Sequence, residues 1–247
     1  MEIAGRAVVI TGGKRIGAAV AVDLARQGAD VAIAFNRSED EAHQTVQQIE
    51  AFGRRGLATR ADLSDAHECQ RFIDHAAREL GRLDVLINMA SVYRAAPVEE
   101  VDAAGWDAVV NVDLRASFLC ARAAIPHIRR TGEGGRIINF ADWVAASRRP
   151  RYLGYLAYYV AKSGVIGLTE ALALELAPEN ILVNAVAPGP ILAPAGTSAK
   201  ESAAVEAATP LGRWGGPVEI VHAVNFLIRS DFVTGETIRV DGGRHLK

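Results

Sequence analysis

The segment RAVVITGGKRIG, residues 6–17, decides the fold that this sequence predicts. A short apolar run, RAVVI at 6–10, leads at once into a glycine-rich turn, and a helix-like stretch begins near residue 15. A strand that passes through such a turn into a helix is typical of the first half of a β-α-β unit. The run is apolar at nearly every position rather than at alternate ones, so the strand is expected to be buried on both faces.

The same alternation of short apolar runs and longer amphipathic stretches continues along the chain. Further strands are predicted at 30–35, 56–60, 83–88, 135–140, 181–186 and 237–240. Helices are predicted near 15–27, 39–52, 65–80, 99–130, 155–177 and 217–229. This order predicts right-handed crossovers and a single Rossmann-type, doubly wound parallel α/β sheet of about seven strands flanked by helices, in one domain spanning residues 1–247.

One irregular stretch interrupts the pattern. PGPILAPAGTSAKES, at 188–202, concentrates Pro, Gly, Ser and Ala. A connection of this length in a compact domain is often a substrate lid, so a substrate loop is predicted near 188–210. A passive surface loop is the alternative.

The composition excludes several classes of function. Half of the 247 residues are hydrophobic, and the formal net charge is −2, with few aromatic residues. A chain of this kind can bury a sizeable core, and it lacks the basic surface that nucleic acids or anionic membranes require. The six histidines show no ligand-like clustering, so no metal site is expected.

The N-terminus, the apolar segments and the cysteines predict the cellular compartment. The N-terminus MEIAGRAVVITGG has neither a basic region nor a long apolar run, and no segment approaches the ~20 apolar residues of a membrane span. A cytoplasmic protein is therefore expected. Cys69 and Cys120 lie far apart in Ala-rich, helix-like segments and are expected to be buried free thiols.

The glycine turn predicts a dinucleotide site. Glycines at a strand-to-helix turn let the backbone approach a pyrophosphate, and the helix N-terminus offers N–H groups and a positive dipole. The residues of the turn expected to bind the cofactor are Gly12, Lys14, Arg15, Ile16 and Gly17.

The end of the second predicted strand indicates which dinucleotide binds. NAD-specific sites place an acid there to hold the ribose 2′-hydroxyl, whereas a 2′-phosphate requires a cation. This chain reads FNRSED, with Asn36, Arg37 and Ser38 before the first acid, Glu39. Arg37 can bind a phosphate bidentately, and Ser38 can donate a further hydrogen bond. NADPH/NADP is therefore predicted over NAD, with a solvated Arg37 as the alternative.

These residues resemble the short-chain dehydrogenase/reductase family over nearly the whole chain. The matching motifs, in order, are TGGKRIG (11–17), ADL (61–63), NMAS (88–91), Asn111 in NVDL, Tyr158 and Lys162 in YYVAK, APG (187–189) and VDGG (240–243). The resemblance implies further cofactor contacts from Asp62, Leu63, Asn88, Ala90, Tyr158, Lys162, Pro188, Gly189 and Ile191. It also implies a homo-oligomer, a tetramer or dimer, with the helices at 99–130 and 155–177 as the interface.

Within the family the chain most resembles the pteridine reductases. They too have an arginine in the glycine turn, an Arg-Ser pair after the second strand and an aspartate where most members carry a serine, here Asp142. By this resemblance Ser91 and Asp142 contact the substrate and Tyr93 stacks on it. The chain departs from the family's usual pattern in its shortened glycine turn, in Met89 and in the long spacing from Asp142 to Tyr158.

The expected catalytic residues are Asp142, Tyr158, Lys162 and Asn111. Tyr158 and Lys162 are four residues apart, so they share one face of a helix. A free tyrosine has a pKa near ~10, and a nearby ammonium is expected to lower it toward working pH. By the resemblance, Lys162 also holds the nicotinamide ribose.

Asp142 is the residue that indicates the substrate. It follows the apolar run GRIINF (135–140), and a carboxylate there is costly unless it is paired, hydrogen-bonded or exposed at the sheet edge. A serine can donate a hydrogen bond to a ketone oxygen, whereas an ionised aspartate only accepts. The site therefore suits a ring that presents N–H groups and receives its proton on nitrogen. The alternative is a strand-end aspartate whose role passes to Ser147 or to no residue.

Three functions are compatible with this sequence. The leading prediction is an NADPH-dependent reductase of a small flat N-heterocycle, such as dihydrobiopterin or dihydrofolate. The second is a general short-chain carbonyl reductase, for example of 3-oxoacyl thioesters, which arginines 148, 149 and 151 near the site favour modestly. The third is a non-catalytic NADP(H)-binding sensor or scaffold, which retention of both Tyr158 and Lys162 disfavours.

Overall fold

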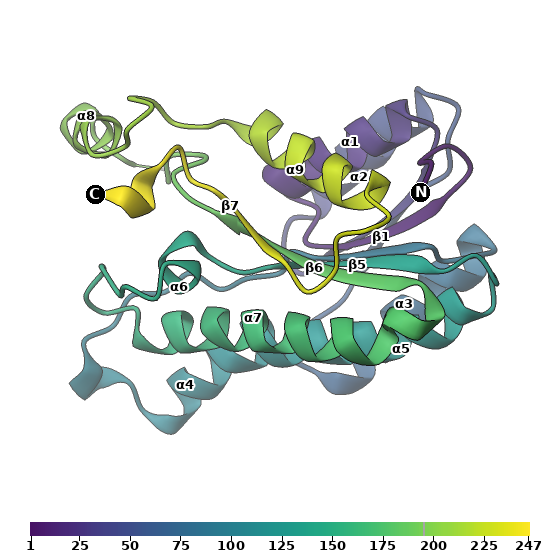
Figure 1. Cartoon of the computed structure of the whole chain (residues 1–247), viewed down its shortest axis with the longest axis horizontal. Coiled ribbons are helices and arrows are strands. Elements are labelled where there is room, and N and C mark those ends of the chain that lie inside the picture. Colours follow the sequence, from purple (N-terminus) through teal and green to yellow (C-terminus); the bar gives the residue numbers. More distant parts are fainter. Residues whose placement is uncertain (195) are drawn as a thin grey trace.

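A computed structural model describes residues 1–194 and 196–247, in which seven strands form one parallel sheet (Figure 1). The strands are β1 (Ala7–Thr11), β2 (Asp30–Phe35), β3 (Gly56–Arg60), β4 (Val85–Asn88), β5 (Gly135–Phe140), β6 (Ile181–Pro188) and β7 (Thr237–Val240). Their order across the sheet is β3-β2-β1-β4-β5-β6-β7, and every adjacent pair is parallel. The predicted doubly wound α/β fold is confirmed.

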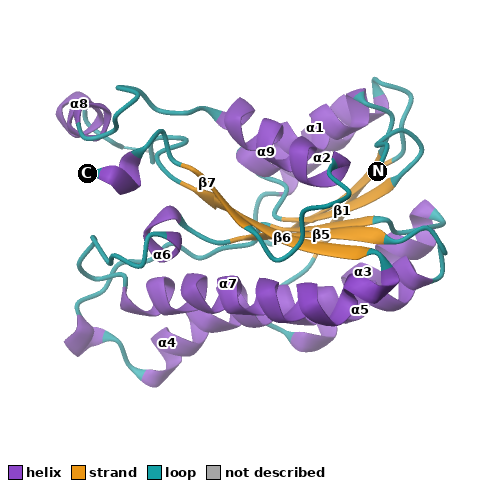
Figure 2. Cartoon of the chain, in the orientation of Figure 1, coloured by secondary structure: helices purple, strands orange, loops and turns teal. Residues whose placement is uncertain are grey.

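Helices cover both faces of this sheet (Figure 2). One face carries α1 (Ile16–Arg26), α2 (Glu39–Glu50) and α9 (Pro217–Arg229). The other carries α3 (Ala66–Leu80), α4 (Ala103–Val110), α5 (Ala116–Arg129) and α7 (Leu156–Leu176). The layered arrangement explains why most of the strand segments are nearly continuous apolar runs, since a strand between two helical layers has no solvated face.

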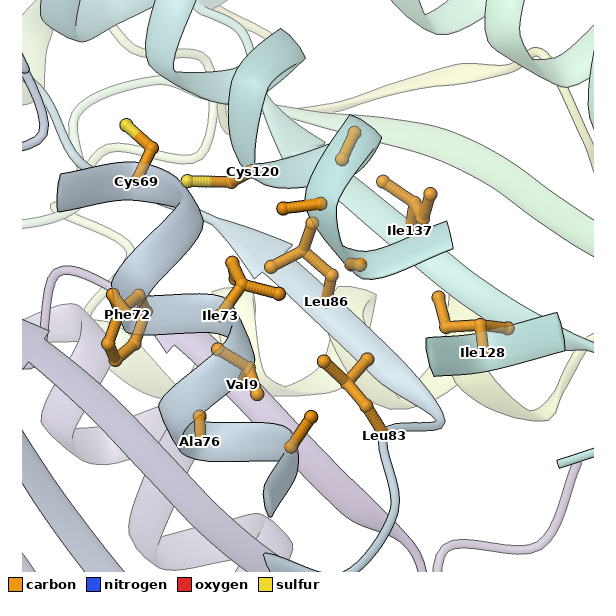
Figure 3. Close-up of a cluster of buried hydrophobic side chains, with 14 of the residues drawn as sticks. Val9, Cys69, Phe72, Ile73, Ala76, Leu83, Leu86, Cys120, Ile128 and Ile137 are labelled. Carbon is orange, nitrogen blue, oxygen red and sulfur yellow. The ribbon is translucent and has the colours of Figure 1, made fainter. Parts of the chain in front are cut away.

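Strand β1 illustrates this double burial. Val8 and Ile10 belong to the core under α1 and α9, whereas Ala7 and Val9 belong to the core under α3 and α5. Figure 3 shows the second of these clusters, with Val9 of β1 facing the side chains of α3. Cys69 and Cys120 lie in the same cluster and are free and buried, as predicted.

The predicted helix over 99–130 is interrupted. A short 3₁₀ turn η1 (Val98–Glu100) precedes α4, whose first turn is capped by the Asp102 side chain, an acceptor from Gly105 N at 2.7 Å. A π-helical segment η2 (Asn111–Arg115) then joins α4 to α5. Such wide turns change the direction of successive side chains, and they occur often at functional sites.

Four short helical elements were not predicted. They are α6 (Trp143–Ala146), η3 (Ala177–Glu179), α8 (Ala199–Ala207) and η4 (Arg244–Leu246). Helix α8 lies within the stretch expected to be an irregular substrate loop. It begins with a capping box, in which Ser198 and Glu201 satisfy each other's backbone N–H groups.

The strand order reverses beside β1. The chain runs outward from β1 to β2 and β3, then returns to place β4 on the other side of β1. Connections leave this point in opposite directions, which opens a crevice at the carboxyl ends of the strands. The ends of β1 and β4 are joined there by the Thr11 hydroxyl, which accepts hydrogen bonds from the backbone N–H groups of Met89 (2.9 Å) and Ala90 (3.2 Å).

Candidate active site

A cleft of about 660 Å³ lies at these carboxyl ends. Among residues 1–194 and 196–247, every predicted site residue lines the cleft except Arg37, Asn88 and Asn111. The topology therefore brings together residues from across the chain, from Gly12 near its start to Arg244 near its end.

The glycine turn forms one wall of the cleft. A Cβ at Gly17 would lie 1.9 Å from the Gly12 carbonyl oxygen, and Gly12 has a φ of 103°, in the region that glycine favours. Arg15, at the position where the family's pattern expects a glycine, has a φ of 55° and so keeps a left-handed backbone. Helix α1 starts without a side-chain cap, which leaves its first N–H groups for a ligand. This small-residue cradle at a helix N-terminus fits a dinucleotide pyrophosphate.

Charged groups beside this cradle are only partly available. The Lys14 ammonium lies 2.6 Å from the Glu41 carboxylate, which belongs to the first turn of α2. The Arg15 guanidinium donates to the Ala193 carbonyl oxygen at 2.9 Å. Arg37 is exposed beyond the cleft lining, whereas its neighbours Asn36 and Ser38 line it.

Asn88 lies beneath the cleft rather than in its wall. Its side-chain amide donates to Asn139 Oδ1 (2.9 Å) and to the Ser117 carbonyl (3.2 Å), and Asn139 in turn donates to Thr169 (3.0 Å). These buried bonds join β4, β5, α5 and α7. The structure places the side chain of Asn88, a residue predicted to bind the cofactor, in a supporting position below the cleft.

Asp142 and Tyr158 are in direct contact. The Tyr158 hydroxyl donates to Asp142 Oδ2 at 3.0 Å, while Asp142 Oδ1 accepts from the backbone N–H of Val144 at 2.7 Å. One carboxylate therefore both caps α6 and faces the phenol. The long spacing between the two residues is taken up by α6 and by the loop at 147–154, so it does not separate them.

Ser147 does not replace the missing serine. Its hydroxyl donates to the Trp143 carbonyl oxygen at 2.5 Å, within the turn that ends α6. Ser147 also lies outside the lining of the cleft that the described residues form. The alternative in which Ser147 takes over the role of position 142 is not supported by this geometry.

Lys162 contacts an aspartate that the sequence analysis did not single out. Its ammonium lies 3.1 Å from Asp113 Oδ1 and donates to the Phe140 carbonyl at 2.9 Å, and both charged side chains are buried. Asp113 also accepts hydrogen bonds from the Ser91 hydroxyl and from Val92 N. The site residue in NVDL is thus Asp113.

The prediction of Asn111 as a catalytic residue is corrected by this placement. The Asn111 side-chain oxygen accepts a hydrogen bond from Arg115 at 3.3 Å, outside the cleft. Residues two apart on a helical segment point in different directions, so Asn111 and Asp113 cannot both face Lys162. The apolar character of the flanking Val112 and Leu114 gave no signal for choosing between them.

The charges around Tyr158 act against its ionisation. Burial raises the pKa of Tyr158 well above its usual value, and the charges of Asp142 and Asp113 raise it further. The expectation that Lys162 lowers this pKa is corrected, because two carboxylates face the phenol and one of them is paired with the lysine. Burial also raises the pKa of Asp142, although Val144 N, Tyr158 and Lys162 oppose that shift.

Aromatic rings form the outer wall of the cleft. Tyr93 stacks on Tyr155 with ring centroids 4.4 Å apart and meets Tyr158 edge-on at 5.0 Å. Trp143 is buried, and the centroid of its ring lies 6.2 Å from the ring centroid of Tyr152 at the rim of the cleft. The Arg244 guanidinium lies 5.9 Å from the Trp143 ring, so the C-terminal η4 also reaches the cleft. Trp143, Tyr152 and Arg244 carried no motif that could have predicted this position.

Residues 1–194 and 196–247 contain no helix long and apolar enough to cross a membrane. No group of three or more His, Cys, Asp and Glu side chains in those residues is arranged to hold a metal ion.

The fold, the glycine cradle and the Tyr158–Lys162 pair define an oxidoreductase, and comparison with known proteins agrees. Residues 12–245 match the family model described as enoyl-(acyl carrier protein) reductase. The chain is 35% identical over 246 residues to the 3-oxoacyl-[acyl-carrier-protein] reductase FabG of Staphylococcus aureus, which covers 98% of each chain. It is 36% identical to the 2-dehydro-3-deoxy-D-gluconate 5-dehydrogenase of Escherichia coli, over 98% of this chain and 96% of that one. The protein belongs to the short-chain dehydrogenase/reductase family.

Solved structures of similar proteins contain either nicotinamide cofactor. A blue fluorescent protein from a metagenomic library, in complex with NADPH, has a TM-score of 0.90 at 34% identity and covers 99% of each chain. The carveol dehydrogenase of Mycobacterium avium, in complex with NAD, has a TM-score of 0.91 at 26% identity and covers 100% of this chain and 99% of its own. Family membership therefore makes this chain an oxidoreductase, and its solved relatives differ in the nicotinamide cofactor that they hold.

Proposed function

We propose that the protein is an NADPH-dependent reductase of a small flat N-heterocycle, of the pteridine reductase type. The observation that carries this proposal is the 3.0 Å hydrogen bond from the Tyr158 hydroxyl to the Asp142 carboxylate. A carboxylate at this position accepts hydrogen bonds and repels a developing alkoxide. It suits a dihydropterin or dihydrofolate ring, which offers N–H groups and takes a proton on nitrogen.

The cofactor supplies hydride when it is bound. Gly12, Arg15 and Gly17 are proposed to hold its pyrophosphate, with Asn36, Arg37 and Ser38 at the 2′-phosphate. Asp62 and Leu63 are proposed to border the adenine. Lys162 has donors left beyond Phe140 and Asp113, and one of them is proposed to bind the nicotinamide ribose.

Tyr158 and Asp142 are proposed to handle the proton. Asp142 accepts an N–H of the substrate and orients the ring. Tyr158 gives its proton to the ring nitrogen, and a proton taken from solvent and passed through the Asp142 carboxyl group restores the phenol. Because the Tyr158 hydroxyl already donates to Asp142, the two residues hold the proton in one defined place before substrate arrives.

Tyr93 and Ser91 are proposed to differ in their roles. Tyr93 is 56% exposed at the mouth of the cleft, and one face of its ring stacks on Tyr155, so a planar substrate is proposed to meet the other face. The Ser91 hydroxyl donates to Asp113, which makes it a support for that carboxylate rather than a substrate contact. This revises the role that the resemblance implied for Ser91.

A second candidate, a 3-oxoacyl thioester reductase, is supported by the comparisons. The FabG of Staphylococcus aureus, at 35% identity, is named as a 3-oxoacyl-[acyl-carrier-protein] reductase. The relatives therefore support reduction of a 3-oxoacyl thioester better than reduction of a pterin. A ketone would need a donor at position 142, which a protonated Asp142 could provide. Burial raises the pKa of Asp142, so this activity should increase as the pH falls.

Steady-state oxidation of NADPH tests both candidates. Dihydrobiopterin and dihydrofolate are compared with acetoacetyl thioesters and simple ketones across a range of pH. Turnover of a pterin with little turnover of ketones supports the proposal. Turnover of ketones and of no pterin rejects it in favour of the second candidate, and NADPH binding without any turnover indicates a non-catalytic binding protein.

A further inference from the structure

Two guanidinium groups gather around the indole of Trp143 in the aromatic wall of the cleft. The central carbon of the Arg151 guanidinium lies 5.5 Å from the centroid of that ring, and the corresponding carbon of Arg244 lies 5.9 Å from it. Arg151 belongs to the loop between α6 and α7, whereas Arg244 begins η4 near the end of the chain. Segments far apart in the sequence thus bring two positive charges to one ring.

Arg244 has hydrogen-bond donors to spare at the cleft. Its side chain is half-buried and lines the cleft, and its guanidinium donates to the Val205 carbonyl oxygen from Nη1 at 3.3 Å. A guanidinium carries five N–H donors in a rigid fork that matches a carboxylate. The bond to Val205 therefore fixes the orientation of Arg244 and leaves further donors for a ligand.

No acid of the protein neutralises this pair of arginines. Among residues 1–194 and 196–247, no carboxylate forms an ion pair with Arg151 or Arg244. The next residue, His245, differs in this respect, because its Nδ1 lies 2.7 Å from the Asp241 carboxylate. Half-buried charges are usually paired, so an anionic group of a bound molecule is the partner that Arg244 lacks.

The position of Arg244 in the cleft indicates which part of a substrate it meets. Asp142, which contacts the Tyr158 hydroxyl, directly precedes Trp143 in the chain, and all three residues line the same cleft as Arg244. Tyr152, which is 45% exposed, lies at the rim beside Trp143. A molecule whose reacting ring lies at Asp142 can thus extend along Tyr152 toward Arg244.

We propose that Arg244 binds a carboxylate at the far end of the substrate and that Arg151 adds to the positive potential there. The preferred substrate then has a reacting group at Tyr158, a planar tail along the aromatic wall and an acid at its end. For the reacting ring the inference rests on the proposed function, and among flat N-heterocycles it selects dihydrofolate, which carries carboxylates beyond a p-aminobenzoyl ring, over dihydrobiopterin, which carries none.

Steady-state kinetics with NADPH and two matched pairs of substrates tests the proposal. One pair is dihydrofolate and its dimethyl ester, and the other is 7-oxooctanoate and its methyl ester, so the members of each pair differ in charge alone. The natural protein should favour the acid of the pair that it reduces by about 10-fold or more in kcat/KM. Equal kcat/KM values for acid and ester, or turnover of neither pair, overturn the proposal whether or not any variant folds.

The variant Arg244→Gln removes the charge and keeps a donor for the Val205 carbonyl. The ratio of kcat/KM for acid over ester should fall about 10- to 100-fold. Arg213→Gln is the matched control and should leave the ratio unchanged, because Arg213 is exposed, is paired with Glu219 at 2.7 Å and lies outside the cleft lining. An unchanged ratio in Arg244→Gln overturns the proposal.

The two pairs separate this inference from the proposed function. Reduction of the keto acid in preference to its ester, with no turnover of dihydrofolate, rejects the pterin activity and supports the carboxylate site. Reduction of dihydrofolate and its ester at equal kcat/KM supports the pterin activity and overturns the carboxylate site.

Discussion

The carbonyl oxygen of Gly12 occupies the place where residue 17 would carry a side chain, since a Cβ built on Gly17 lies 1.9 Å from that oxygen. The two glycines hold the turn against the first turn of α1, where the cofactor's pyrophosphate is proposed to bind. A side chain at position 17 therefore has to displace backbone.

Gly17→Ala should abolish tight NADPH binding, with a rise in Kd of about 100-fold or more, because the turn must open to admit the methyl group. Titration of NADPH fluorescence measures the change. Gly167→Ala is the control, since no atom lies within 4 Å of a Cβ built at that position on α7. Equal losses in the two variants would contradict the assignment of the turn.

Replacement of Arg37 tests the choice of cofactor. Arg37→Ala should weaken NADPH binding about 10- to 100-fold and leave NADH binding unchanged, because only NADPH carries a 2′-phosphate. Glu41→Gln should strengthen NADPH binding, since it frees the Lys14 ammonium from its 2.6 Å ion pair with the Glu41 carboxylate. Calorimetric titration of both dinucleotides checks this, and natural protein that binds NADH as tightly as NADPH would refute the prediction.

Asp142→Ser tests the proton relay. Serine can still accept from Val144 N and cap α6, so the fold should be retained. Loss of the carboxylate should lower kcat/KM for dihydrobiopterin about 100-fold while the Kd for NADPH changes less than about threefold. Ketone turnover should rise, because a hydroxyl donor is restored. A variant that reduces pterins normally would exclude Asp142 from the reaction.

Asp142→Asn should stabilise the protein near neutral pH. Burial raises the pKa of Asp142 in the folded chain above the ordinary value of 3.8 that it has in the unfolded chain. The folded state then binds more protons than the unfolded state between those two values, so stability falls as the pH rises through this window. The gain in Tm from Asp142→Asn should be present at neutral pH and disappear below about pH 4. Thermal melts across that range measure it, and a variant that is less stable at neutral pH would contradict the sign.

Oligomerisation through the α5 and α7 faces is a separate prediction. Phe118 of α5 and Val160 of α7 each leave 41% of their surface exposed, so both helices offer apolar contact area to a second copy of the chain. The natural chain should elute as a tetramer on gel filtration with light scattering, and Phe118→Glu should yield smaller species. A natural chain that elutes as a monomer would refute this prediction.

The fold could be predicted in detail because its signal is repeated in every strand. Most of the strand runs are nearly continuously apolar, and each of the seven strands was located from the sequence to within two residues at either end. The interruption at η2 could not be predicted, since the apolar periodicity of 99–130 runs through it without a break.

The site was predicted only where a motif names the residue. Tyr158, Lys162 and Asp142 lie together as expected, because their positions follow from strand ends and from helical spacing. Asp113 was missed, since its choice over Asn111 depends on the direction of side chains in a π-helical turn. Side-chain direction in such a turn is set by tertiary packing and leaves no trace in local composition.

The aromatic outer wall of the cleft has a practical consequence for engineering. Trp143 and Tyr152 belong to α6 and the loop behind it, and Trp214 and Arg244 belong to segments that follow β6 and β7. None of these residues contributes to the hydrogen-bonded ladder of the sheet. Loops grafted from relatives into these positions could retarget the enzyme to new molecules while the hydride and proton chemistry stays intact beneath them.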